Sequence, residues 1–154
     1  MRLDPDNALL SLQSLSSVDS VRRLEEQIAH LPQIDMQSQT LVHGRMAARA
    51  IFIPAGSLVT GVQTNRDNIS IVVGDITVTT EAGPVRLTGF NIIPAGAGFK
   101  RAVIAHADTW WATVHHTDLT DISAIEEEMT DEPENLQTRR LALDARGRAA
   151  LSGE

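Results

Sequence analysis

The chain has 154 residues, and its 20 acidic side chains outnumber 13 lysines and arginines, giving a formal net charge of −7. This balance argues against nucleic acid as a partner, because phosphate binding needs a basic face. The absence of cysteine excludes disulfides, thiolate nucleophiles and cysteine-ligated metal centres. No apolar run approaches the roughly 20 residues of a membrane span, and the first residues lack the layout of a signal peptide. We therefore expect no membrane partner and no secretion by a signal peptide.

Residues 1–40 are expected to form an N-terminal helical arm. Apolar side chains recur there at helical spacing, at Val21, Leu24, Ile28 and Leu31. Ser17 or Asp19 is a suitable N-cap, and Pro32 follows the expected end. The single apolar face packs either on the chain's own barrel or on a neighbouring subunit. For the second case, the candidate interface residues are Val21, Leu24 and Ile28.

Residues 41–117 are rich in Val, Ile and Thr, with Gly, Pro, Asn and Asp between the apolar runs. The pattern predicts strands near 48–53, 58–63, 69–73, 75–80, 84–88, 90–93, 101–106 and 109–116. Residues 73–75 and 81–84 are expected to be hairpin turns. Many short strands without room for crossover helices favour an antiparallel sandwich or barrel.

Residues 118–154 are expected to form a C-terminal helical tail. Ile122, Ile125 and Met129 mark a short amphipathic helix with Asp121 as its cap, and residues 131–134 break it. A second helical stretch with four arginines follows, through 136–151. It is either a terminal helix held on the chain itself or a docking segment for an acidic partner.

A four-residue repeat lies within the strand-rich stretch, as Ile53-Pro54-Ala55-Gly56 and Ile93-Pro94-Ala95-Gly96. Each copy stands between apolar runs, which indicates one sheet motif used twice. This layout resembles the cupin family. The stretch 50–129 more narrowly resembles small cupin-like proteins encoded by tailed phages, through 51–61, 74–78, 100–102 and 105–121. The resemblance implies a mainly β fold, a cupin-like antiparallel double-stranded β-barrel (jelly roll) with N-terminal and C-terminal helices.

The sequence departs from this family where metal-dependent cupins carry their ligands. Such cupins place His-x-His and a Glu in the first motif and a further His in the second. Residues 61–68 here contain no histidine, and Phe99 stands where the second motif has its histidine. The resemblance therefore implies the fold without its usual metal chemistry, because a catalytic metal needs several converging ligands. We expect no catalytic residue, no metal ligand and no cofactor.

Two pairs of adjacent residues lie on the last expected strand, where neighbouring side chains face opposite ways. One of His115 and His116 should point inward, and a relocated metal site built from it with His43 and His106 stays open as an alternative. One of Trp110 and Trp111 should likewise be core and the other an interface anchor, and both are candidate interface residues.

These observations predict a non-enzymatic structural or assembly protein. The resemblance to phage-encoded proteins further implies a component of a phage virion (head or tail), found in the virion or the host cytoplasm. Its expected partners are further copies of itself, as a homo-oligomer, and other virion proteins. One alternative is a module that binds a sugar or an organic acid at the barrel mouth. Its ligand-binding residues would be Gln63, Asn65, Phe99 and His115. The other alternative is a metal-dependent cupin enzyme with the rearranged histidine site.

Overall fold

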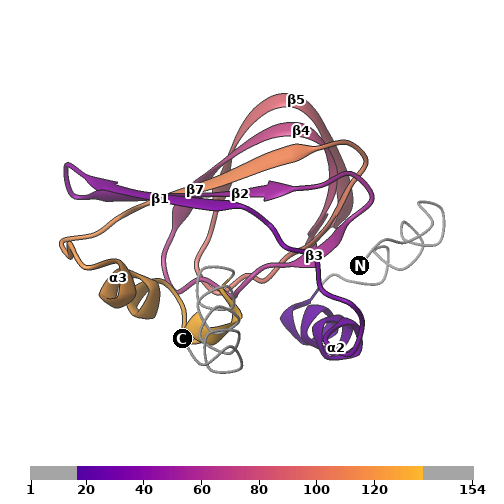
Figure 1. Cartoon of the computed structure of the whole chain (residues 1–154), viewed down its shortest axis with the longest axis horizontal. Coiled ribbons are helices and arrows are strands. Elements are labelled where there is room, and N and C mark those ends of the chain that lie inside the picture. Colours follow the sequence, from indigo (N-terminus) through magenta and orange to yellow (C-terminus); the bar gives the residue numbers. More distant parts are fainter. Residues whose placement is uncertain (1–16, 137–154) are drawn as a thin grey trace, which may run out of the picture.

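The computed structural model describes residues 17–136, which form one curled antiparallel sheet with helices below it (Figure 1). The strands are β1 (Ser38–His43), β2 (Met46–Ile53), β3 (Leu58–Thr60), β4 (Asn68–Thr80), β5 (Gly83–Ala95), β6 (Ala102–Ala105) and β7 (Thr109–His116). The helices are α2 (Val18–Ile28), α3 (Ile122–Met129) and the short 3-10 helix η1 (Pro133–Asn135). The expected second helix of the tail lies outside the described residues, apart from Leu136.

The long hairpin β4–β5 turns the sheet into a barrel. The strand order is β1-β2-β7-β4-β6-β3, with β5 on β4. The first half of β4 pairs with β7, from Ile69 to Val73, whereas the second half pairs with β6, from Ile76 to Val78. One strand therefore belongs to both halves of the curled sheet. The predicted fold class, a mainly β antiparallel barrel of the cupin-like jelly-roll type with helices at both ends, is confirmed.

The sheet bends where Gly74 of β4 pairs with Gly89 of β5. Both residues have positive φ, 150° and 71°. A Cβ on Gly74 would lie 2.8 Å from the carbonyl oxygen of Asp108 and 2.8 Å from Cα of Thr109. The expected hairpin turn at 73–75 is wrong, because glycine here lets a continuous strand bend instead of reversing. The turn expected at 81–84 is confirmed as the tip of the β4–β5 hairpin.

Each copy of the Pro-Ala-Gly repeat follows or ends a strand, β2 in one case and β5 in the other. An aspartate carboxylate accepts a backbone hydrogen bond at or next to each copy. Asp108 Oδ1 accepts from the backbone N–H of Ala55, within the first copy, at 2.9 Å, and Asp67 Oδ1 accepts from Ala97, just past the second copy, at 2.8 Å. The repeat thus marks two strand ends, although the two bonds are not at matching positions.

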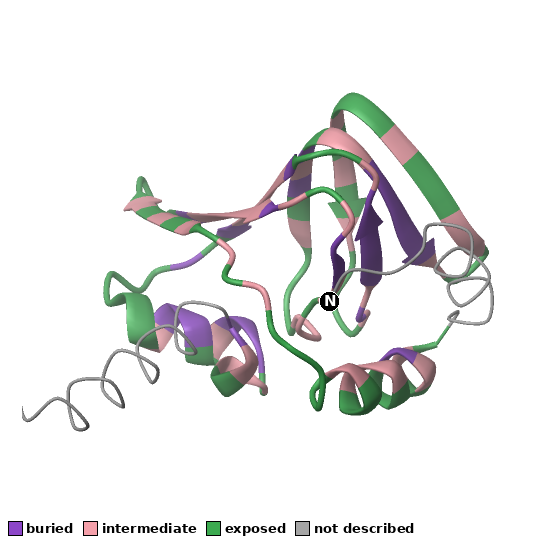
Figure 2. Cartoon of the chain, turned by 45° about the vertical axis from the view of Figure 1, so that its right-hand side comes forward, coloured by how far each residue is buried: buried purple, intermediate pink, exposed green. Residues whose placement is uncertain are grey.

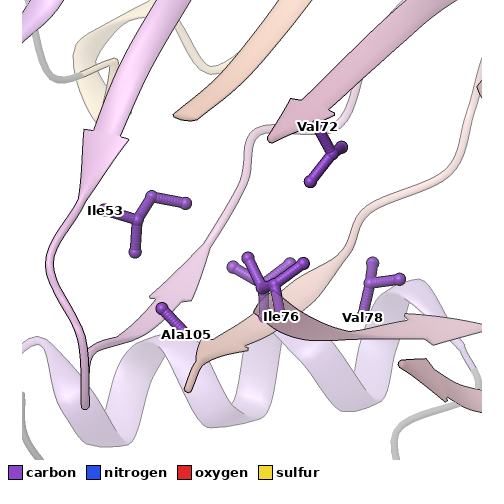
Figure 3. Packing of buried hydrophobic residues seen from close by; sticks show 6 residues of the cluster. Ile53, Val72, Ile76, Val78 and Ala105 are labelled. Atoms are coloured by element: carbon purple, nitrogen blue, oxygen red, sulfur yellow. The ribbon is translucent and has the colours of Figure 1, made fainter. Parts of the chain in front are cut away.

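The main core lies between the two halves of the sheet. Ile53, Val72, Ile76, Val78 and Ala105 point toward one another there (Figure 3). Figure 2 shows the buried stretches of the strands mainly under the arch of the sheet, whereas the tip of the β1–β2 hairpin is exposed. The core is built from β-branched side chains, which suit a pleated surface.

Helix α2 lies on the chain's own barrel. Ser17 is its N-cap and forms a reciprocal pair of hydrogen bonds with Ser20. Val21 is fully buried against Leu58 and Ile104, with Leu24 and Ile28 packed beside it. This corrects the assignment of Val21, Leu24 and Ile28 to an intersubunit interface, since their apolar surface is used within the chain. Among the described helices, none combines the length and apolar character that a membrane crossing requires.

A buried ammonium group links α2 to residues 129–136, from the end of α3 onward, which we call the C-terminal segment. Lys100 is the only lysine of the chain, and its side chain has no exposed surface. Its Nζ lies 3.0 Å from Glu25 Oε2 of α2 and 2.9 Å from Glu132 Oε2, beyond α3. Arg22 also pairs with Glu132 at 3.5 Å, and Thr60 donates to Glu25 at 2.8 Å. We call the group of Lys100, Glu25 and Glu132 the lysine clamp.

We expect Gly74→Ala to lower the free energy of unfolding by about 2–4 kcal/mol, because the added Cβ overlaps backbone atoms and the φ is unfavourable for other residues. Gly89→Ala is the matched control. Its φ is also positive, but nothing lies within 4 Å of its added Cβ, so it should cost about 1–2 kcal/mol. Urea unfolding of the two variants measures both values. Equal losses would contradict the close approach at Gly74.

We expect Lys100→Met to cost about 3–5 kcal/mol, because it leaves two carboxylates without their buried cation. Burial by itself raises the pKa of Glu132, but hydrogen bonds from Lys100 and the Gln63 backbone, with the charges of Lys100 and Arg22, lower it overall from its ordinary value of 4.5. A lowered folded pKa stabilises the protein above pH 4.5, and this stabilisation is lost as the pH falls through the folded pKa.

The variant should reverse that pH dependence. Without the ammonium group the two carboxylates repel, which raises the pKa of Glu132, so mild acidification should stabilise Lys100→Met. Thermal unfolding between pH 7 and pH 4 compares the two proteins. A parallel loss of stability in both would contradict the lysine clamp.

Candidate ligand cavity

The barrel contains a cavity of about 460 Å³ between the sheet, α2 and the C-terminal segment. This volume falls within the range of small-molecule sites. Helix α2 contributes Glu25 and Ile28 to its wall, and the C-terminal segment contributes Met129 and Leu136. Both elements are held by the lysine clamp, so the clamp also holds part of the cavity wall in place. The apolar wall is completed by Ile51, Ile53, Leu58, Val59, Val103 and Trp111.

A polar row crosses the floor of this cavity. Residues that pair directly across antiparallel strands point to the same face, and the register places Thr40, Arg49, Thr113 and Ser70 side by side on β1, β2, β7 and β4. The last three line the cavity. One guanidinium and two hydroxyl groups thus stand together on the floor of the cavity.

Arg49 is the charged residue of this row, and its guanidinium group is not fully hydrogen-bonded among the described residues. Its Nε is buried and finds no hydrogen-bond partner among residues 17–136, and the same holds for Oγ1 of the neighbouring Thr40. Burial lowers the pKa of Arg49, although the nearby charge of Glu126 acts in the opposite direction. A buried donor without an acceptor costs about 1–3 kcal/mol, or more when charged. An incoming acceptor at Nε would recover that free energy.

A second guanidinium lies on the wall of the cavity. Arg101 stacks over the ring of Phe99, 5.0 Å from its centroid, and donates to the carbonyl oxygen of Thr79 at 3.3 Å. Burial lowers the pKa of Arg101. Phe99 lines the cavity, as expected for a ligand-binding residue, although its contact with a ligand stays a prediction.

Gln63 and Asn65 have a different role from the one predicted. Gln63 Nε2 donates to the Gly98 carbonyl at 3.0 Å and its Oε1 accepts from Arg22 at 2.6 Å, while Asn65 Nδ2 donates to Asp131 Oδ1 at 3.0 Å. Neither residue lines the cavity. This corrects their assignment as ligand contacts, because their amides fasten α2 and the C-terminal segment to a barrel loop.

His115 points inward and His116 outward, as the strand alternation predicts. His115 is 5% exposed, and neither ring nitrogen has a partner among the described residues. Burial lowers the pKa of His115, opposed by the charge of Glu128. The ring does not line the cavity, which corrects its placement among the ligand contacts. On β7, His115 is the next inward-facing residue after Thr113.

The two tryptophans face opposite sides of the sheet, as expected. Trp111 faces the cavity and packs against the main core. This corrects its assignment to an interface, because its ring is used inside the barrel. Trp110 faces outward, where its ring lies 5.2 Å from that of Phe52.

The alternative histidine site is not assembled in residues 17–136. His43 is exposed near the β1–β2 turn, His106 hydrogen-bonds Thr77 Oγ1 at 2.7 Å, and His115 is buried below the sheet. No three histidine, aspartate or glutamate side chains in this part of the chain are grouped to hold a metal ion. The rearranged metal enzyme therefore has no structural support in the described residues.

Arg49 was not singled out in the sequence, although a signal existed. Strand β2 alternates, so Ala47, Arg49, Ile51 and Ile53 share one face, and the 2% and 1% exposures of Ala47 and Ile53 mark it as inward. An arginine within an inward-facing apolar series costs free energy unless its buried charge has a partner. That expected cost is the signal that could have identified it.

Comparisons with known proteins give structural neighbours only, since no family model and no curated protein matches the sequence. A cupin superfamily protein of Desulfitobacterium hafniense matches with a TM-score of 0.48 and 13% identity, over 58% of this chain and 84% of that chain. KdgF from Halomonas matches at 0.48 and 18%, over 56% and 84%. An RmlC-like cupin of Methanocaldococcus jannaschii matches at 0.46 and 16%, over 57% and 84%. The first and third of these neighbours are described as cupins, whereas the narrower resemblance to phage proteins stays a prediction.

Proposed function

We propose that this protein is a non-enzymatic binding module for a small carboxylic acid with an apolar body, held in the barrel cavity by Arg49. The observation that carries the proposal is the buried Nε of Arg49, which lies on the floor of a partly open cavity and lacks an acceptor among the described residues. Guanidinium groups match carboxylates in geometry and charge. The hydroxyls of Ser70 and Thr113 would orient the second oxygen.

The rest of the cavity limits which anion fits. Its apolar wall favours a ligand with a hydrocarbon or aromatic body. Glu25 and Asp35 also line the cavity, and carboxylates there disfavour additional negative charge on the ligand. Glu25 is engaged by Lys100 and Thr60, and no histidine lines the cavity. These features support selective binding of a monocarboxylate without acid–base catalysis.

Matched ligand pairs test the proposal by calorimetry. Hexanoate and benzoate should bind about 10–100-fold more tightly than hexanamide and benzamide, because a hydrogen bond to a charged group contributes about 1.5–3 kcal/mol. Arg49→Gln should abolish this preference, whereas Arg49→Lys should keep part of it because it retains the charge. Circular dichroism checks that the variants are folded.

Arg23→Gln provides the control for net charge. Arg23 is exposed on α2 and bonds the Asp19 carbonyl at 3.4 Å, outside the cavity. It should leave the carboxylate preference unchanged. If Arg23→Gln and Arg49→Gln weaken binding equally, or if amides bind as tightly as acids, the proposal is wrong.

The virion role remains a second prediction, supported by the resemblance to phage-encoded proteins. Helix α2 does not support a virion role, because its apolar face packs on the chain's own barrel. Mass spectrometry of purified particles would test it, and consistent absence of the protein from them would refute it.

A further inference from the structure

The outer face of the sheet is almost entirely apolar over β1, β2, β7, β4 and the second half of β5. The alternation that turns Arg49 and Thr113 inward turns their neighbours outward. The register sets these outward residues in cross-strand rows. The rows contain Leu41, Ala48, Val114, Ile69 and Pro94; Gln39, Ala50, Ala112, Ile71 and Ile92; and Phe52, Trp110, Val73 and Phe90. We call this surface the outer sheet face.

The exposed apolar residues of the described chain concentrate on this face. Ten large apolar side chains are exposed in residues 17–136, and five of them lie here: Leu41, Ile69, Val73, Phe90 and Ile92. A sixth, Met46, lies at the edge of the face, where it pairs with His43 and His116. Phe90 and Leu41 are each 67% exposed and Ile92 is 62% exposed. Figure 2 shows exposed stretches along the outermost strand of the arch, β5. The concentration distinguishes this face from scattered surface residues.

The size of the outer sheet face suits a stable dimer. Each large side chain that is half to two-thirds exposed offers roughly 100 Å². Together with the partly exposed residues between them, the face reaches on the order of 800 Å², which is what one partner contributes to a standard interface. The largest apolar patch on a typical monomer is about 300–600 Å².

The chemistry of the face favours a second copy of this chain. Two chains of net charge −7 repel each other, but the three rows contain no charged residue. Ala48, Ala50 and Ala112 form a shallow strip on β2 and β7, and β4 separates it from the bulky Phe90 and Ile92 on β5, so one face carries both recesses and projections. We infer that two copies pack through their outer sheet faces about a two-fold axis, as closed symmetric dimers do.

Charge substitution tests the interface in the full chain. Sedimentation equilibrium should show a dimer for the natural sequence at micromolar concentration. Phe90→Glu with Ile92→Glu should weaken dimerisation at least about 100-fold, because two central apolar anchors become charged. Val85→Glu is the control, since Val85 is 45% exposed on β5 beyond the Gly89 bend. It should remain dimeric.

Thiol protection separates a second copy from other occupants. The chain has no cysteine, so Ile92→Cys introduces a single thiol on the face. Its reaction with a maleimide should be slow at high protein concentration and at least tenfold faster on dilution, whereas Val85→Cys should react equally at both. Protection that does not depend on concentration indicates cover by the chain's own remaining residues. That result, a monomeric natural protein, or a dimer that survives the double glutamate substitution would overturn the inference.

Discussion

The contact between Lys100 and the carboxylates of Glu25 and Glu132 determines how the rest of the molecule is arranged. A fully buried ammonium group is costly unless it is paired, and here it is paired twice. The two carboxylates come from opposite ends of the described chain, on α2 and beyond α3. Because one cation holds both, α2 and the C-terminal segment are fixed over the open end of the barrel. The cavity between these elements and the sheet follows from that arrangement.

The two faces of one sheet then serve different purposes. On the inner face, Arg49, Thr113 and Ser70 place polar groups at the floor of the cavity. On the outer face, the intervening residues form a continuous apolar surface. The period of two along each strand makes this separation possible, because a single strand such as β2 supplies both surfaces. The bend at Gly74 and Gly89 closes the barrel without interrupting β4 or β5.

The sequence predicted the elements that depend on local signals. The capped start of α2, for which the sequence offered Ser17 or Asp19, the helix ending at Met129 and the hairpin at 81–84 each have a recognisable turn or capping residue. It did not indicate β1, whose alternating residues include polar Ser38, Gln39 and Thr40, although the positive φ values of Gly44 and Arg45 are typical of a two-residue hairpin. The roles of Lys100, Gln63 and Asn65 could not be predicted, because their partners are distant in sequence. Only the folded chain brings them together.

The most direct test of a carboxylate site is the side-chain Nε–Hε spectrum of ¹⁵N-arginine-labelled protein, titrated with benzoate. The Arg49 signal, assigned by its loss in Arg49→Lys, should shift saturably as its buried Nε gains an acceptor, while the signal of exposed Arg23 stays in place. An Arg49 signal that does not move at saturating benzoate, or that moves no more than the Arg23 signal, would contradict the account.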